Sequence, residues 1–364
     1  MILSSKFRRT FLVFLCFTGA VLLVFFMIST QYLTITSMNL YREVRSHLPL
    51  VSPVTIISQN VTNYQTTEVP SPKTEKSVVN ISENLVSEES LKQIITGIYE
   101  PCFDFHINKP TACNGMKAPV ALIVISAVTK RSARNAIRAT WGGYATKLGF
   151  PVLFLLGGTP YPHQQLTIDK EDAFFQDIIQ EKCLDTYRNM TLKTVTLMKW
   201  VAEHCFNVPY ILKTDDDMMI NVDRLQLFLS SLNATKTIFG KLASGWSPHR
   251  SHLSKWYVPK SEYKDRVYPN FTTGPAYLFT SDSARNLYET SLKVPFLFLE
   301  DVYMTGIVAQ QARIRRLSNT EFKNYPLRAA ARTFKKIISS HGHSPRDIYK
   351  IWFRFYKPSV EDDR

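Results

Sequence analysis

The sequence lacks the patterns that would identify a nucleic-acid-binding protein, although it is strongly basic. Its 364 residues include 44 lysines and arginines but only 30 aspartates and glutamates, which gives a formal net charge of +14. A basic balance favours anionic partners, namely nucleic acid, anionic lipid or phosphate-bearing small molecules. Because the chain has no zinc-finger spacing, no RNA-binding signature and no long tail of lysine and arginine, we do not expect nucleic acid to be the partner.

Long hydrophobic runs are also scarce, since only residues 11–28 form a run long enough to cross a bilayer as a helix. Three basic residues precede this run, and no basic residue follows it until Arg42. The positive-inside bias therefore predicts a single-pass type II membrane protein, with a cytoplasmic tail at residues 1–10 and a signal anchor at residues 11–28. The alternative, a cleaved signal peptide, requires a shorter apolar region and a better cleavage site.

Cysteine is rare, with five residues, of which Cys16 lies in the predicted anchor. The other four are Cys102, Cys113, Cys183 and Cys205, an even number that an oxidising lumen could pair in three ways. We favour bonds between sequence neighbours, Cys102 with Cys113 and Cys183 with Cys205. The same secretory-pathway location agrees with the N-glycosylation sequons at Asn60, Asn80, Asn189, Asn233 and Asn270.

The rest of the chain divides into two parts of different composition. Residues 29–117 are rich in serine, threonine and asparagine and poor in aromatic residues, which indicates a flexible luminal stem. From residue 118 onward, predicted buried strands alternate with helical segments, the strands at 120–128, 151–158 and 209–213 and the helices at 131–141, 171–180 and 193–205. This alternation predicts an α/β catalytic domain over residues 118–364, with a mostly parallel sheet that binds ligands beyond the carboxyl ends of its strands.

An acidic triplet, formed by Asp215, Asp216 and Asp217, follows the last of these strands and precedes another apolar run. Adjacent carboxylates at the edge of a core repel one another unless a cation or a proton neutralises them. Magnesium and manganese sites typically use one or two carboxylates together with substrate phosphates. Since Asp215 and Asp217 share one face of an extended segment, the triplet predicts a divalent metal site. The alternative is a solvated turn or a helix N-cap.

Two other groups of charged residues could bind a ligand or carry out chemistry. Arg131, Arg134 and Arg138 have the spacing of one helical face, which indicates either a grip on phosphate groups or a solvated basic face. Glu300 and Asp301 interrupt an otherwise apolar run. Since a buried carboxylate without a partner is costly, they indicate either a general base whose basicity is set by burial or the N-cap of a helix.

Five segments occur in one order along the chain: RNAIRATWG, DTYRNMTLKT, YILKTDDDMMIN, YPNFTTGPAYLFT and FLEDVYMTGI. Together they resemble the β-1,3-galactosyltransferase and β-1,3-N-acetylglucosaminyltransferase family of Golgi enzymes, over residues 118–356. The resemblance implies a GT-A-like nucleotide-sugar-binding domain in the Golgi lumen. It also implies an inverting transfer of a hexose from a UDP-sugar to a glycan acceptor on protein or lipid. Galactose is the first expectation for the donated sugar, and N-acetylglucosamine and N-acetylgalactosamine are the alternatives.

The resemblance also implies roles for the residues of the acidic triplet. Asp217 is expected to be the main ligand of Mn²⁺ on the UDP diphosphate, and Asp215 and His341 are expected to complete the metal shell. Asp215 and Asp216 are also expected to lie near the ribose and the sugar of the donor.

Further roles are implied for the other two groups. Asp301 is expected to be the catalytic base, with Glu300 beside it. The nucleotide side of the site is expected to include Arg134, Arg138, Trp141, Asn189 and Lys193.

Two functions from other classes stay open on the sequence alone. A non-catalytic luminal protein could keep the same fold as a glycan-binding protein or as a chaperone for a related enzyme. A metal-dependent phosphoesterase also uses clustered carboxylates. The expected partners are a UDP-sugar, a glycan acceptor and, through the anchor, the Golgi membrane, and the sequence is compatible with a homo- or a hetero-oligomer.

Overall fold

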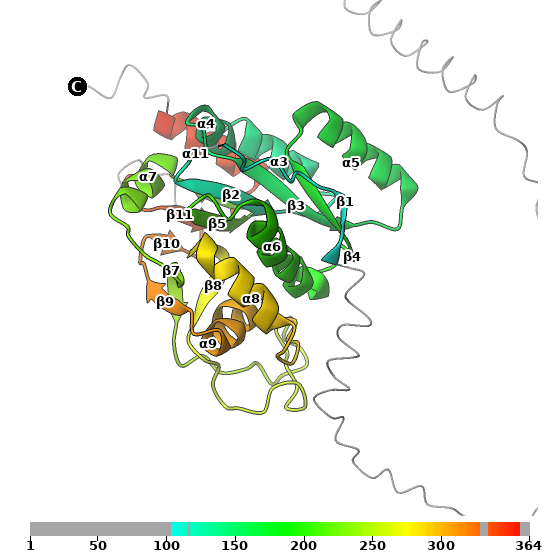
Figure 1. Cartoon of the computed structure of the whole chain (residues 1–364), viewed down its shortest axis with the longest axis vertical. Coiled ribbons are helices and arrows are strands. Elements are labelled where there is room, and N and C mark those ends of the chain that lie inside the picture. The colour runs from blue at the N-terminus through cyan, green and yellow to red at the C-terminus, as the bar shows by residue number, and fades with distance from the viewer. Residues whose placement is uncertain (1–102, 116, 328–333, 357–364) are drawn as a thin grey trace, which may run out of the picture. The chain divides into compact units, whose positions relative to one another are not determined.

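The structure is a computed structural model that describes residues 103–115, 117–327 and 334–356 (Figure 1). Its main sheet has eight strands in the order β1-β4-β3-β2-β5-β8-β7-β9. These strands are β1 (Phe105–Ile107), β2 (Val120–Ile125), β3 (Val152–Gly158), β4 (Ile178–Leu184), β5 (Tyr210–Asp215), β7 (Thr237–Ala243), β8 (Phe271–Thr280) and β9 (Arg315–Ser318). Four of the pairings are parallel and three are antiparallel, which confirms the predicted α/β class with a mostly parallel sheet.

Helices cover both faces of the main sheet, as the burial of strand β2 shows. All its residues are buried, and alternate side chains such as Leu122 and Ile123 belong to two different hydrophobic clusters, as the two-residue period of a strand requires. The cluster with Ile123 includes side chains of α6 (Met190–His204) and α8 (Ala284–Ser291), which lie in front of the sheet in Figure 1. The other cluster includes side chains of α3 (Arg131–Arg138), α4 (Trp141–Lys147), α5 (Pro162–Phe175), α7 (Val222–Ser230) and α11 (Pro345–Tyr356).

A second, three-stranded sheet brings a distant part of the chain to the acidic triplet. Strand β6 (Met218–Ile220) directly follows the triplet and pairs antiparallel with β11 (Ser339–His341). Strand β10 (Phe322–Lys323) pairs with β11 on its other side. Since His341 lies opposite Met218 in this register, the small sheet places an imidazole beside the aspartates.

The first part of the described chain belongs to the folded domain. Strand β1 pairs antiparallel with β4 at the edge of the main sheet, and Phe103 is buried in the hydrophobic cluster on the α6 side. The predicted boundary between stem and catalytic domain at residue 117 is therefore too late, because sheet pairing begins by Phe105. The predicted cytoplasmic tail, the anchor at 11–28 and residues 29–102 lie outside the described ranges. Within those ranges, no helix is both long and apolar enough to cross a bilayer.

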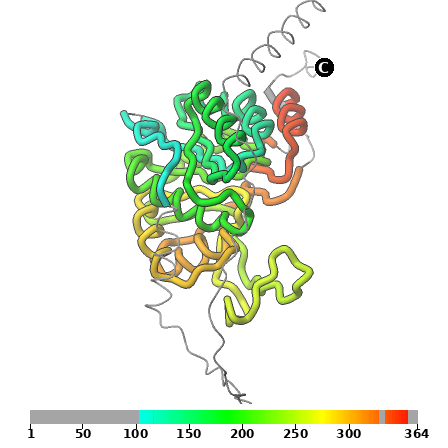
Figure 2. Tube along the Cα trace, turned by 90° about the vertical axis from the view of Figure 1, so that its right-hand side faces the viewer, coloured from blue at the N-terminus to red at the C-terminus, as the bar shows by residue number. Residues whose placement is uncertain are grey.

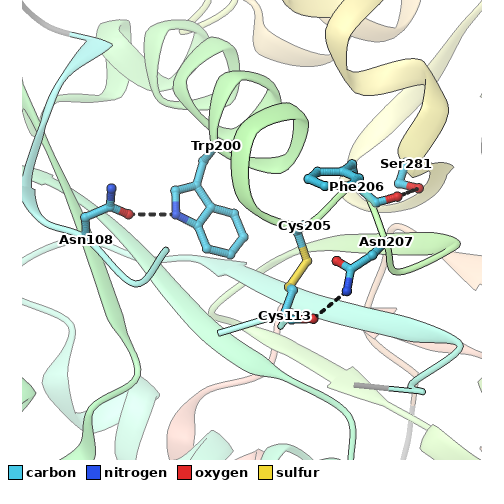
Figure 3. The surroundings of a disulfide bond; sticks show 7 residues. All are labelled: Asn108, Cys113, Trp200, Cys205, Phe206, Asn207 and Ser281. Atoms are coloured by element: carbon cyan, nitrogen blue, oxygen red, sulfur yellow. Dashed lines mark hydrogen bonds between the residues drawn. A yellow bond between two sulfur atoms is a disulfide. The ribbon is translucent and has the colours of Figure 1, made fainter. Parts of the chain in front are cut away.

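A disulfide bond joins this first part to the end of α6 (Figure 3). The bond is between Cys113 and Cys205, so the predicted pairing of sequence neighbours is wrong. The side-chain amide of Asn207 donates to the backbone oxygen of Cys113 at 2.8 Å. The indole N–H of Trp200 donates to Asn108 at 2.9 Å beside the bond. Sequence proximity misled the prediction because folding brings together two residues with a sequence separation of 92.

One predicted helix is partly a strand. Residues 171–180 were expected to be helical, but α5 ends at Phe175, where Gln176 adopts a left-handed conformation with φ of 56°. Strand β4 then begins at Ile178. The other helical elements of the described ranges are η2 (Tyr187–Asn189), η3 (Ser281–Ser283), the π-helical η4 (Val302–Val308) and α9 (Ala309–Gln311).

Candidate active site

The acidic triplet lies where the main sheet meets the small sheet. Asp215 is the last residue of β5, Asp217 directly precedes β6, and His341 is the last residue of β11. One ligand atom from each of these side chains lies within 4.8 Å of the others, and Nε2 of His341 is 3.2 Å from Oδ2 of Asp217. The structure thus brings together the three residues that were predicted to share a metal ion.

The donor atoms of this group fit a divalent cation. Oδ1 of Asp217 is buried, and no described residue donates a hydrogen bond to it. Burial acts to raise the pKa of Asp217, but the hydrogen bond with His341 and the charge of that imidazole outweigh burial and hold the pKa below its usual value. Asp217 is therefore ionised and has an oxygen directed at no protein donor. Carboxylates and imidazole are both common ligands of divalent metal ions.

Negative charge at this edge of the sheet exceeds the positive charge in contact with it. The carboxylates are Asp215, Asp216, Asp217, Glu300 and Asp301. Among the described residues, the cationic side chains in ion-pair contact with these carboxylates are Lys213 and His341. A bound cation would reduce the remaining repulsion between the carboxylates.

Lys213 connects the candidate metal site, formed by Asp215, Asp217 and His341, to the carboxylate pair of Glu300 and Asp301. Its side chain is completely buried, and its ammonium donates to Oδ1 of Asp215 and to the backbone oxygen of Gly274, both at 2.8 Å. It also lies 3.4 Å from Oε2 of Glu300. Burial acts to lower the pKa of Lys213, but the charges of Asp215 and Glu300 raise it further than burial lowers it. Sequence reasoning missed Lys213, although a lysine inside an apolar strand was a visible signal.

Glu300 and Asp301 lie at the start of η4, against strand β8. Oδ2 of Asp301 accepts a hydrogen bond from the backbone N–H of Gly274 at 3.0 Å, and Oδ1 accepts one from the N–H of Val302 at 2.9 Å. Glu300 accepts a hydrogen bond from the hydroxyl of Tyr277 at 2.8 Å. The sequence left two interpretations open for this pair, a helix N-cap and a general base. Asp301 fits both, because it caps the first turn of η4 and is also a candidate base.

The surroundings of Asp301 make it more basic than an ordinary aspartate. Burial is the main cause that raises its pKa, and the charge of Glu300 adds to the effect. The backbone donors at Val302 and Gly274 oppose the increase, and the resulting pKa is about 6. A carboxylate with this pKa is mostly ionised at neutral pH and accepts a proton more readily than an exposed one.

Asp216 contacts the end of strand β2 instead of the metal group. Its Oδ2 accepts a hydrogen bond from the hydroxyl of Ser126 at 2.7 Å. Burial raises the pKa of Asp216, and the Ser126 hydrogen bond opposes the increase. Arg134 donates to the same hydroxyl at 3.2 Å, so it supports Asp216 through Ser126.

Arg134 and Arg138 do not form a solvated basic face. Arg134 is fully buried and donates to both carboxylate oxygens of the buried Glu171, at 2.7 and 2.8 Å. Arg138 donates to Glu171 and to both oxygens of Asp177, all at 2.8 Å. These guanidinium groups therefore have carboxylate partners that join α3 to α5 and the segment after it, and Arg134 also donates to the backbone oxygen of Ala127 in the loop after β2. Their contact with a nucleotide stays a prediction.

Trp141 and Lys193 are likewise bonded to groups that shape the site. The indole N–H of Trp141 donates to the backbone oxygen of Met218, the residue after the triplet, at 3.0 Å. Lys193 donates to Asp185 at 2.7 Å and to the backbone oxygen of Ser126 at 3.2 Å. Trp141 therefore fixes the backbone next to the triplet, and Lys193 fixes the end of β2 whose Ser126 contacts Asp216. Their place beside the donor stays a prediction.

Comparison with known proteins places this carboxylate site in a family. The sequence model described as galactosyltransferase matches residues 132–320, which include the triplet, Glu300 and Asp301. The chain belongs to the galactosyltransferase family. Membership makes it a glycosyltransferase and confirms the resemblance seen in the sequence.

Proteins named as beta-1,3-galactosyltransferases are among its relatives. The chain is 36% identical over 255 residues to beta-1,3-galactosyltransferase 1 of Homo sapiens and equally to that of Mus musculus, covering 69% of this chain and 78% of the relative. It is 35% identical to beta-1,3-galactosyltransferase 2 of Homo sapiens over 261 residues, covering 69% of this chain and 61% of that relative. Among solved structures, the WbbM bifunctional glycosyltransferase apo structure aligns with a TM-score of 0.39 and 11% identity, over 70% of this chain and 51% of that chain. This last likeness is too weak to carry an argument.

Proposed function

We propose that this chain is an inverting β-1,3-galactosyltransferase that transfers galactose from UDP-galactose to a glycan acceptor on a glycoprotein or glycolipid. Family membership and the names of its relatives support this proposal. The structural observation that carries it is Asp301, a partly buried carboxylate with a raised pKa, whose neighbour Glu300 is linked through Lys213 to Asp215 of the candidate metal site. A proton acceptor beside a cation-binding group is what a single displacement on a nucleotide-sugar requires.

In this mechanism Asp301 takes the proton of the acceptor hydroxyl. The hydroxyl oxygen attacks the anomeric carbon of galactose while the bond to the UDP oxygen breaks on the opposite face, so an α-linked donor gives a β-linked product. One displacement needs no covalent intermediate, and no protein nucleophile is required. The N–H groups of Gly274 and Val302 hold the carboxylate of Asp301 in one orientation.

Asp215, Asp217 and His341 would hold the divalent cation, which we propose is Mn²⁺. When bound, it supplies positive charge that stabilises the diphosphate of departing UDP. Ser126 keeps Asp216 turned toward the end of β2, near the expected position of the donor ribose. Lys213 lies between Asp215 and Glu300 and limits the repulsion between their charges.

We also propose a Golgi location with single-pass type II topology. The uncharged run at residues 11–28 and the basic residues before it support this proposal. The disulfide bond between Cys113 and Cys205 agrees with folding in an oxidising compartment. The substrates would accordingly be glycans that pass through the secretory pathway.

The decisive experiment is a panel of UDP-sugars tested with Mn²⁺ against simple β- and α-linked glycosides, with product linkage determined by NMR. We expect UDP-galactose to be used and a β-1,3 linkage to form, and we expect chelation of divalent ions to abolish transfer. Preferred use of UDP-N-acetylglucosamine or UDP-N-acetylgalactosamine would correct the sugar. Absence of transfer from every donor would overturn the proposal in favour of a glycan-binding protein or chaperone. Phosphate release without an acceptor would indicate a phosphoesterase.

A further inference from the structure

Two neighbouring serines of strand β11 differ in their hydrogen bonds, although both are almost completely buried. Ser339 is 1% exposed and Ser340 is 0% exposed. The hydroxyl oxygen of Ser339 has no hydrogen-bond partner among the described residues. The hydroxyl of Ser340 has three partners, which are the backbone oxygen of Tyr325, the backbone N–H of Leu327 and Nε2 of His343. The strand precedes α11, the red helix in Figure 2.

The chemistry of these partners fixes the direction of each hydrogen bond. A hydroxyl group has one proton to donate and two lone pairs that accept. Because the backbone oxygen of Tyr325 can only accept, it takes the hydroxyl proton of Ser340 at 3.1 Å. The two lone pairs then accept from the N–H of Leu327 at 3.0 Å and from the ring N–H of His343 at 2.8 Å. The full hydrogen-bonding capacity of Ser340 is therefore used, and the imidazole of His343 carries a proton on Nε2.

The backbone of His343 holds the acidic triplet. Its N–H donates to the backbone oxygen of Asp217 at 2.9 Å. Only Gly342 separates His343 from the candidate metal ligand His341, and its φ of 82° allows the chain to turn sharply between them. Nε2 of His341 is in turn 3.2 Å from Oδ2 of Asp217. Asp217 thus contacts both histidines, one through its backbone and the other through its side chain.

We infer that Ser340 is a positioning residue for the candidate metal site and acts through His343. By holding the imidazole of His343, Ser340 fixes the turn at Gly342. This turn sets the distance between the side chains of Asp217 and His341, because it joins the backbone contact of the first to the strand that carries the second. Groups that orient the ligands of a metal ion typically change metal affinity about 10–100-fold when they are removed. The inference rests on the proposed metal-dependent transfer and adds a residue to it.

The Mn²⁺ affinity of the full chain tests this role without any transfer reaction. Mn²⁺ is titrated into the protein in the absence of donor, and the EPR signal of the unbound ion gives the dissociation constant. With Ser340→Ala we expect this constant to rise about tenfold or more. Ser339→Ala removes the same hydroxyl group from the neighbouring residue, where the described structure shows no hydrogen bond, and should keep the constant within about twofold of wild type. Equal constants for the wild type and Ser340→Ala would overturn the inference.

A second variant breaks only the contact between Ser340 and His343. His343→Phe keeps an aromatic ring and the backbone N–H, and it leaves the bonds of Ser340 with Tyr325 and Leu327 in place. We expect it to weaken Mn²⁺ binding as much as Ser340→Ala does. The double variant should bind Mn²⁺ no more weakly than either single variant, since residues that act as one unit have non-additive effects. Additive effects on the affinity would show that the two side chains act separately and would contradict the inference.

Amide hydrogen exchange of the metal-free protein separates this inference from the proposed function. The N–H of His343 is bonded to Asp217, so its exchange, measured by mass spectrometry, should become about tenfold faster in Ser340→Ala and stay unchanged in Ser339→Ala. An unchanged rate in Ser340→Ala would overturn the positioning role even if the enzyme is active. Faster exchange and weaker Mn²⁺ binding, in a protein that transfers no sugar, would support the positioning role and overturn only the proposed transfer. A wild-type protein that binds no Mn²⁺ would overturn both.

Discussion

Asp301 and Asp217 are both aspartates, yet their surroundings move their pKa values in opposite directions. Burial and the charge of Glu300 raise the pKa of Asp301, whereas the hydrogen bond with His341 outweighs burial and lowers the pKa of Asp217. The first environment suits a group that must accept a proton, and the second suits a group that must remain ionised to bind a cation. Two identical side chains thus differ in acidity because of their neighbours.

Replacing the proposed base tests this division at the scale of one residue. Asp301→Asn keeps nearly the same shape but can no longer take a proton at neutral pH. We expect kcat to fall about a hundredfold or more, while Mn²⁺-dependent binding of UDP, measured by calorimetry, stays unchanged. A variant that transfers galactose at the wild-type rate would show that another group is the base.

The pH dependence of the reaction reports on the same residue. Because Asp301 has a pKa of about 6, it is protonated below that pH and unable to act as a base. The value of kcat/KM should therefore be constant near neutral pH and fall about tenfold per unit well below pH 6. The residual activity of Asp301→Asn should lack this acidic limb. An unchanged rate down to about pH 4.5 would contradict the assignment.

Single-residue predictions from the sequence succeeded where the signal was local. The triplet and the pair Glu300 and Asp301 stand out because carboxylates interrupt apolar runs. The ion pairs of Arg134 and Arg138 with Glu171 join two helices, so no local spacing could reveal them. Helical periodicity correctly placed both arginines on one face of α3, but it could not show that this face is buried against α5.

At the scale of elements, strand β8 and η4 together position the proposed base. Gly274 lies in β8 with its backbone N–H directed at Asp301 and its backbone oxygen accepting from Lys213. Glycine has no Cβ and therefore permits a close approach at this position. The partner that approaches it comes from η4, and only the packing of η4 against β8 identifies it as the Glu300–Asp301 pair.

A methyl group at position 274 should disturb this contact. A Cβ there would lie 3.2 Å from Oε2 of Glu300, which is closer than most real contacts, and would also meet Cβ of Asp301 at 3.4 Å. We expect Gly274→Ala to displace Asp301 and lower kcat by about tenfold or more, since small misplacements at a reacting centre are costly. The melting temperature measured alongside should change little. If kcat remained at the wild-type value, the fit between β8 and η4 would be looser than the structure shows.

Pairing between distant elements was the main feature that the sequence could not reveal. Strands β2, β3 and β5 were predicted because continuous apolar runs are typical of strands buried on both faces. Strand β11 is only three residues long, and its pairing with β6 depends on contacts between segments far apart in the chain. The metal group depends on that pairing, so only the resemblance to a family could indicate His341 before the structure.

At the scale of the whole molecule, the disulfide bond and the catalytic groups lie at opposite ends of strand β5. Cys205 ends α6 shortly before Tyr210 begins the strand, and Asp215 ends it. The bond therefore holds the N-terminal segment against the body without taking part in the site.

Removing this bond should affect stability more than catalysis. In the double variant Cys113→Ala and Cys205→Ala, the unfolded chain gains the freedom of a loop with a sequence separation of 92. The expected loss is about 4–5 kcal/mol of unfolding free energy by the chain-entropy model, measured by denaturant titration. At a temperature where the variant is folded, kcat and both KM values should match the wild type. A lost activity in a fully folded variant would contradict the separation of bond and site.

The contacts of Lys213 have a consequence for anyone who recombines relatives of this enzyme. Its ammonium contacts Asp215, two residues further along the chain, and Glu300, which is 87 residues away in sequence. A hybrid with a crossover between positions 215 and 300 inherits the lysine from one parent and Glu300 from the second. Parents that differ at either position would leave a buried charge without its counterpart, which is strongly destabilising. Positions 213, 215 and 300 therefore have to be exchanged as one set.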